Sequence, residues 1–140
     1  MPVALEIVSP ERLLLSRSVE MVVIPAQEGD MGVLEGHTPM MVTLRGGVIV
    51  LYENDQVIEQ LFVAGGFAEV TQERCTVLAN EALPVAELSR DESERRLQEA
   101  EAEFAQLQGA DIEEQFMALD RVHAARAMME AAETLLSGSR

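Results

Sequence analysis

The sequence predicts a β-sandwich N-terminal domain followed by a C-terminal antiparallel α-helical hairpin, with the two domains expected at residues 1–86 and 87–140. Val, Ile and Thr number 21 in residues 1–84 but only three in residues 88–140. β-branched residues favour strands, whereas the Ala, Glu, Gln, Arg and Leu of the second part favour helices. The prolines agree with this division, because all five lie at or before Pro84.

Short apolar runs separated by turn-forming residues predict the strands of the first domain. Asn54-Asp55 has the length of a two-residue hairpin turn, and both residue types tolerate positive φ. Gln27–Gly32 is expected to be a turn. Many short strands at this spacing are typical of a sandwich or barrel. The predicted strands are Val3–Val8, Val19–Ile24, Met40–Leu44, Val48–Glu53, Gln56–Ala64, Phe67–Thr71 and Cys75–Ala79.

Residues 89–108 and 111–137 are predicted to form the two helices. Ser89 and Glu92 have the spacing of a capping box, Gly109 is expected to end the first helix, and Asp111 caps the second. The short connection makes the helices antiparallel. Both apolar stripes are narrow and rich in Ala, so we expect the hairpin to dock weakly. The stripes are Leu97, Ala100, Phe104 and Leu107 in the first helix, and Phe116, Leu119, Val122, Ala125, Met129, Ala132 and Leu136 in the second.

Charge and residue usage exclude several classes of function. The formal net charge of -15 argues against binding to nucleic acid and against adsorption to anionic lipid. All ten basic residues are Arg, which excludes Schiff-base chemistry and a phosphate-binding P-loop. One Cys and two His are too few for a thiolate zinc site, so no metal or cofactor is expected. No apolar run approaches the ~20 residues of a membrane span, and the start lacks the features of a signal peptide.

The most distinctive segment, residues 28–39, contains three Gly, three carboxylates and one His. It lacks the Gly-Lys-Ser/Thr of a phosphate cradle and the alternating Asp residues of a calcium loop. An acid–base site here would use Glu28, Asp30, Glu35 and His37. The alternative interpretation is an exposed surface loop, either merely solvated or shaped to contact a partner.

Several short motifs follow one another in a fixed order along the β part. They are Val8-Ser9-Pro10-Glu11, Val23-Ile24-Pro25-Ala26, Glu28-Gly29-Asp30-Met31-Gly32-Val33-Leu34, His37-Thr38-Pro39, Gly46-Gly47-Val48, Phe62-Val63-Ala64-Gly65-Gly66-Phe67-Ala68-Glu69-Val70 and Thr76-Val77-Leu78-Ala79. In this order they resemble the epsilon subunit of bacterial F-type ATP synthases. The helical hairpin agrees with that family in position and length.

The resemblance implies a non-catalytic central-stalk rotor subunit of a proton-translocating ATP synthase. It would couple rotation of the membrane c-ring to the catalytic sector through the gamma subunit, on the cytoplasmic face of the bacterial inner membrane and peripheral to it. One face of the sandwich would hold gamma, and its foot would touch the c-ring without inserting into the membrane. The hairpin would reach the catalytic hexamer and regulate it weakly.

The resemblance also assigns candidate contact residues. Asp30 and His37 match an acid and a His in the ring-facing loop of the family, and Glu28, Met31 and Gly32 lie in the same loop. No catalytic, cofactor-binding or metal-binding residue is implied. Nucleotide-sensing members begin the first helix with Ile/Leu-Asp-x-x-Arg-Ala. The corresponding stretch here is Leu88-Ser89-Arg90-Asp91-Glu92-Ser93, so regulatory ATP binding is not expected.

The second helix contains six acids and two bases, a local net charge of -4, which would repel acidic neighbours and make the hairpin a weak brake at most. Two other functions remain open at this point. The first is a free-standing β-sandwich interaction module with a helical arm. The second is a small enzyme that uses the acids and the His of the segment 28–39.

Overall fold

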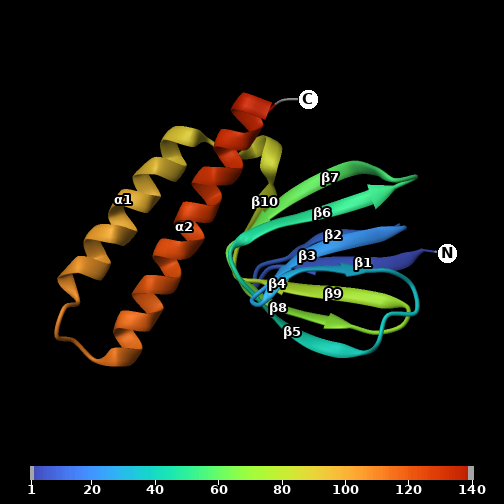
Figure 1. The fold of residues 1–140 in the computed structure, drawn as a ribbon, viewed down its shortest axis with the longest axis horizontal. Helices are drawn as coiled ribbons and strands as arrows, with labels where there is room; N and C mark the ends of the chain where they lie inside the picture. Colours follow the sequence, from blue (N-terminus) through green and yellow to red (C-terminus); the bar gives the residue numbers. More distant parts are fainter. Residues whose placement is uncertain (1, 139–140) are drawn as a thin grey trace.

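The computed structural model describes residues 2–138 as a β-sandwich followed by a two-helix hairpin (Figure 1). This confirms the predicted fold class. A short 3-10 helix, η1 (Val85–Glu87), connects the two parts, and the hairpin consists of α1 (Arg90–Gln106) and α2 (Ile112–Gly138). The strands are β1 (Val3–Val8), β2 (Leu13–Val19), β3 (Met21–Ala26), β4 (Gly29–Val33), β5 (Met40–Leu44), β6 (Gly47–Glu53), β7 (Gln56–Val63), β8 (Gly66–Val70), β9 (Arg74–Ala79) and β10 (Ala82–Pro84).

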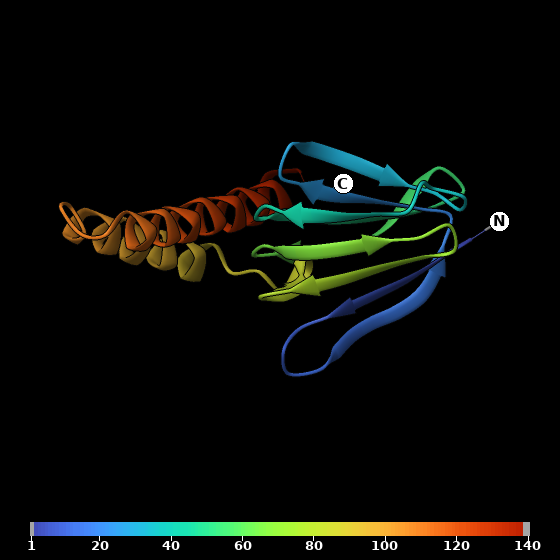
Figure 2. The same ribbon diagram turned by 90° about the horizontal axis from the view of Figure 1, so that it is seen from below.

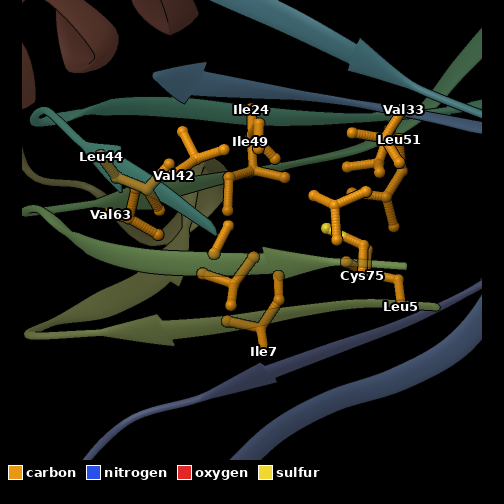
Figure 3. Packing of buried hydrophobic residues seen from close by; sticks show 14 of the residues in the cluster. Leu5, Ile7, Ile24, Val33, Val42, Leu44, Ile49, Leu51, Val63 and Cys75 are labelled. Carbon is orange, nitrogen blue, oxygen red and sulfur yellow. The ribbon is translucent and has the colours of Figure 1, made fainter. Parts of the chain in front are cut away.

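The strands form two layers, and Figure 2 looks onto the layer that contains β5, β8, β9, β1 and β2. One layer has the order β10-β7-β6-β3-β4 and the other has the order β5-β8-β9-β1-β2. The two are joined at a corner, where β3 and β5 share a single register pair, Ala26 with Leu44. Neighbouring strands are antiparallel except β1 and β9, which are parallel. Apolar side chains that point inward from both layers fill the core, among them Leu5, Ile7, Ile24 and Ile49 (Figure 3).

Three strands are absent from the sequence prediction. The sequence does not predict β2 or β10, and it predicts a turn at Gln27–Gly32, where β4 begins at Gly29. β4 forms because the chain reverses at Gln27-Glu28 and pairs with β3 over five residue pairs. The predicted hairpin turn is confirmed, since Asn54 and Asp55 have φ of 52° and 62°.

The caps of the hairpin agree with the sequence at most points. The Ser89 side chain accepts a hydrogen bond from the Glu92 backbone N–H at 3.2 Å, and Gly109 has a φ of 84° in the connection. The Glu92 carboxylate is bound by Arg95 and Arg96 rather than by the N-cap backbone. These two Arg donors lower the pKa of Glu92.

An apolar cluster and a set of ion pairs hold α1 and α2 together. Leu97, Ala100 and Phe104 of α1 pack against Val122 and Ala125 of α2, as the stripes predicted. Three ion pairs cross between the helices: Arg90 with Glu133 at 3.3 Å, Arg121 with Glu103 at 2.9 Å, and Arg126 with Glu101 at 3.1 Å.

The predicted stripe of α2 is wrong at its N-terminal end. Phe116 is 61% exposed, whereas Ala118 and Met128 are buried. The contact with the sandwich explains the burial of Met128, because α2 packs there on Phe62 and Val85 as well as on α1. Met129 is only half-buried, and the side chain of Leu136 lies outside the described residues.

The hairpin contacts the sandwich through α2. Met128 and Ala131 pack on Phe62 and Val85, beside the outer face of β6, β7 and β10. Gly46, between β5 and β6, lies against Ala124, and a Cβ atom on it would be 2.8 Å from the Ala124 Cα. Arg96 of α1 donates to Glu81 at 2.9 Å in the turn before β10. The far end of the hairpin extends beyond the sandwich (Figure 1).

The single cysteine provides a test of this packing. Cys75 is fully buried in the core, and burial raises the pKa of its thiol to about 11. Because only the thiolate reacts, we expect native protein at about pH 8 to resist a thiol-specific disulfide reagent. The same protein in concentrated guanidinium chloride should react completely. Rapid stoichiometric labelling of the native protein would contradict the burial of Cys75.

Candidate functional site

The five predicted contact residues lie in β4 and in the segments on either side of it. This corrects the prediction that they lie in one loop. Glu28 is in the β3–β4 turn, Asp30, Met31 and Gly32 are in β4, and His37 is in the connection to β5. The structure therefore does not bring Asp30 and His37 together. Among the strands that the structure describes, β4 pairs with β3 alone, so its other edge is free for contact.

Asp30 and His37 belong to opposite ends of the sandwich. Asp30 forms an ion pair at 2.5 Å with Arg45, at the end where the hairpin docks. His37 follows Gly36, whose N–H donates to the Gln72 carbonyl in the β8–β9 turn at the other end. A partner that contacts both residues must extend along the β4 edge.

The individual environments of these residues favour contact over catalysis. Glu28, Asp30 and Gly32 are exposed, whereas Met31 is half-buried against the core. His37 is half-buried, with Nδ1 at 2.8 Å from the Thr38 carbonyl oxygen. Of the four residues proposed for an acid–base site, Glu28 and Asp30 lie at the other end of the sandwich from His37, and only Glu35 shares the β4–β5 connection with the imidazole. Within residues 2–138, no three His, Cys, Asp or Glu side chains meet as a metal site.

Sequence reasoning missed a second surface, on the layer that does not carry the hairpin. Phe67 in β8 lies opposite Leu78 in β9, and Leu78 lies opposite Val8 in β1. Phe67 is 53% exposed and Leu78 is 51% exposed. In β5, Thr43 is the register partner of Phe67. Met41 lies two residues before Thr43 on the same face and is 67% exposed. We call Met41, Phe67, Leu78 and Val8 the apolar row.

The alternation of residues in β8 and β9 is the sequence signal from which the apolar row could be found. In β8, Phe67 alternates with the buried Ala68, and in β9, Leu78 alternates with the buried Val77 and Ala79. Large apolar side chains therefore occupy the outward register on adjacent strands. Neighbouring exposed apolar side chains on a sheet are typical of a contact surface.

A cavity of about 740 Å³ lies between the hairpin and the sandwich. Its charged lining contains two guanidinium groups, of which Arg96 is bonded to Glu81 and Arg121 to Glu103. Both of these carboxylates also line the cavity, together with Glu99 and Asp120, which gives the lining a net charge of -2. A polyphosphate needs free cationic donors, so this cavity does not suit a nucleotide.

Together, the sandwich, the hairpin, the free edge of β4 and the exposed apolar row are features that suit a subunit of a larger assembly better than an enzyme with its own active site. Residues 2–85 match the family described as "ATP synthase, Delta/Epsilon chain, beta-sandwich domain". The ATP synthase epsilon chain of Granulibacter bethesdensis is 61% identical over 92% of this chain and 96% of its own length. That of Gluconacetobacter diazotrophicus is 42% identical over 94% of both chains. The chain belongs to the ATP synthase epsilon chains, which are non-catalytic subunits of the ATP synthase complex.

Solved structures share the fold across both domains. A chain of the Euglena gracilis mitochondrial ATP synthase (OSCP/F1/c-ring) superposes with a TM-score of 0.73 at 23% identity, covering 93% of this chain and 81% of that one. A chain of the Tetrahymena thermophila mitochondrial ATP synthase central stalk and c-ring gives a TM-score of 0.68 at 13% identity, over 94% and 97%. Neither helix of the described chain combines the length and the apolar character needed to cross a membrane.

Proposed function

We propose that this chain is a rotor subunit in the central stalk of a proton-translocating F-type ATP synthase. It couples rotation of the c-ring to the catalytic sector through the gamma subunit, and it is peripheral to the cytoplasmic face of the bacterial inner membrane. The observation that carries this proposal is the exposed apolar row on a layer that the hairpin leaves uncovered. Membership in the epsilon-chain family and the free edge of β4 support it.

The apolar row is the proposed gamma contact. Burying a large apolar side chain stabilises an interface by about 1.5–3 kcal/mol, and charging it reverses that gain. We therefore expect Phe67→Asp to weaken co-purification with gamma at least tenfold, since 1.4 kcal/mol corresponds to a factor of ten.

Val57→Asp is the matched control, because Val57 is 46% exposed on β7 in the other layer. It should retain gamma. Both variants are checked for a native urea-unfolding transition before the comparison. Normal gamma binding by a folded Phe67→Asp variant would contradict the assignment.

The β4 edge and the following loop are the proposed ring contact, through Glu28, Asp30, Met31, Gly32 and His37. Replacing Asp30 and His37 together by Ala removes two polar groups, each of which contributes about 0.5–1.5 kcal/mol when hydrogen-bonded. We expect proton pumping in membranes to fall roughly threefold or more. The ATPase activity of the detached catalytic sector should not change.

A control for that variant replaces one acid and one His elsewhere. Glu94→Ala with His123→Ala removes an exposed acid and an exposed His from the hairpin. Pumping should stay normal in this control. A collapse of soluble ATPase activity in the Asp30, His37 double variant would place the β4 edge against a different neighbour.

The hairpin is proposed to reach the catalytic hexamer with a weak regulatory effect. Arg121 and Arg126 are the basic residues of α2, and both are already paired with acids of α1. They are therefore poorly placed to attract acidic neighbours. This pairing and the net charge of -4 in residues 111–137 support weak inhibition over a strong brake.

A further inference from the structure

The cavity between the hairpin and the sandwich has apolar walls that lead toward the exposed end of the hairpin. Phe62 of the sandwich and Met128 of α2 line its inner part, and Met117 lines it closer to the hairpin connection. Met117 is also 59% exposed, and its neighbours Phe116 and Ile112 are 61% and 62% exposed. Met117 belongs to both the cavity lining and this exposed turn, and we call the cavity and the turn together the hairpin groove.

Acidic side chains surround the hairpin groove. Within the cavity, Asp120 has no ion-pair partner among the described residues, and Glu99 is 64% exposed while paired with Arg95. Along the exposed turn, Asp111, Glu113 and Glu114 precede the first base of α2, Arg121. The groove therefore combines an apolar floor with a negatively charged rim.

We propose that the hairpin groove binds a basic amphipathic segment of a partner protein. Its volume lies within the ~300–1,000 Å³ of ordinary ligand pockets, and the exposed Met117, next to the buried Phe62 and Met128, can receive the apolar side of a helix together with Phe116 and Ile112. Lys or Arg side chains on such a helix would meet the acidic rim. Charge disfavours two other occupants: a second copy of this chain carries a net charge of -15, and a nucleotide finds both guanidinium groups of the cavity engaged.

The test uses the full isolated chain with its methionine methyl groups labelled for NMR. The probe is a Leu/Arg peptide of about four helical turns, with its Arg residues on one side. We expect the signals of Met117 and Met128 to shift, while Met41 in the apolar row stays unchanged. A Leu/Glu peptide with the same pattern, and ATP, should shift neither groove methionine.

A pair of charge variants tests the role of the rim. Glu99→Gln with Asp120→Asn should weaken peptide binding at least threefold. Glu11→Gln with Glu73→Gln removes the same charge from exposed positions on the sandwich and should leave binding unchanged.

Three outcomes would overturn the proposal: equal shifts at Met41, equal binding of the acidic peptide or of ATP, or no shift at millimolar basic peptide. None of them bears on the rotor assignment, because no other subunit is present. That assignment is tested separately by retention of gamma.

Discussion

Replacing Gly66 with Ala is expected to lower the free energy of unfolding by about 4 kcal/mol, a large part of the 5–15 kcal/mol that stabilises a typical domain. Gly66 begins β8 with a φ of +136°, and a Cβ atom there would overlap the carbonyl oxygen of Leu78. It would also lie 3.0 Å from the Ala79 Cα. The obstacles are backbone atoms of β9 that cannot move aside, so backbone strain and overpacking, each about 1–3 kcal/mol, add together.

Urea unfolding of the full chain measures this loss, provided that the m-value stays unchanged. Gly29→Ala is the matched control, because Gly29 has a φ of +142° with nothing within 4 Å of the added Cβ. It should lose only the strain of the backbone angle, about 1–2 kcal/mol. Equal losses in the two variants would show that the approach of β9 does not determine the cost at Gly66.

Replacing Gly46 with Ala is expected to release the hairpin while the sandwich stays folded. The added Cβ would lie 2.8 Å from the Cα and 3.2 Å from the Cβ of Ala124 in α2. Relieving this overlap costs about 1–3 kcal/mol. Since 1.4 kcal/mol corresponds to a factor of ten, that cost should raise the undocked population at least about fivefold.

Undocking would expose Phe62 and Met128, which are buried in the docked state. We expect increased binding of a hydrophobic dye and a solvent-exposed Met128 methyl signal in NMR. The control is Gly32→Ala, because among the described residues its Cβ would meet Met21 Sδ at 3.6 Å and no atom of the helices within 4 Å. An unchanged Met128 signal in the Gly46 variant would show that α2 adapts without leaving.

Strands that carry clear alternation were predictable, whereas strands that depend on a neighbour were not. β6 alternates buried and half-buried residues, and its apolar run is visible in the sequence. β4 contains Gly29, Asp30 and Gly32, which have low strand propensity, and it exists because β3 offers a free edge. β2 is an edge strand with three exposed residues in sequence, Ser16 to Ser18, so its pattern is too polar to stand out.

The candidate contact residues can be proposed from the sequence, but their arrangement cannot be predicted from it. Asp30 and His37 could be selected by their motifs, but seven residues of separation gave no sign that an extended strand would place them at opposite ends. The apolar row depends on the register between β8, β9 and β1, and that register includes a parallel pairing between distant parts of the chain. Local sequence cannot specify such a pairing.

The ion pairs between α1 and α2 also determine how the hairpin can move. The helices are joined along their length by three such pairs and an apolar cluster, whereas the sandwich holds mainly one side of α2. We therefore expect the hairpin to separate from the sandwich before α1 separates from α2, so that the two helices move together as one rigid unit. Leu88 and Ser89, both extended, form the pivot between η1 and α1. With α2 spanning 27 residues, or roughly 40 Å, a rotation of about 10° would carry the far end by roughly 7 Å.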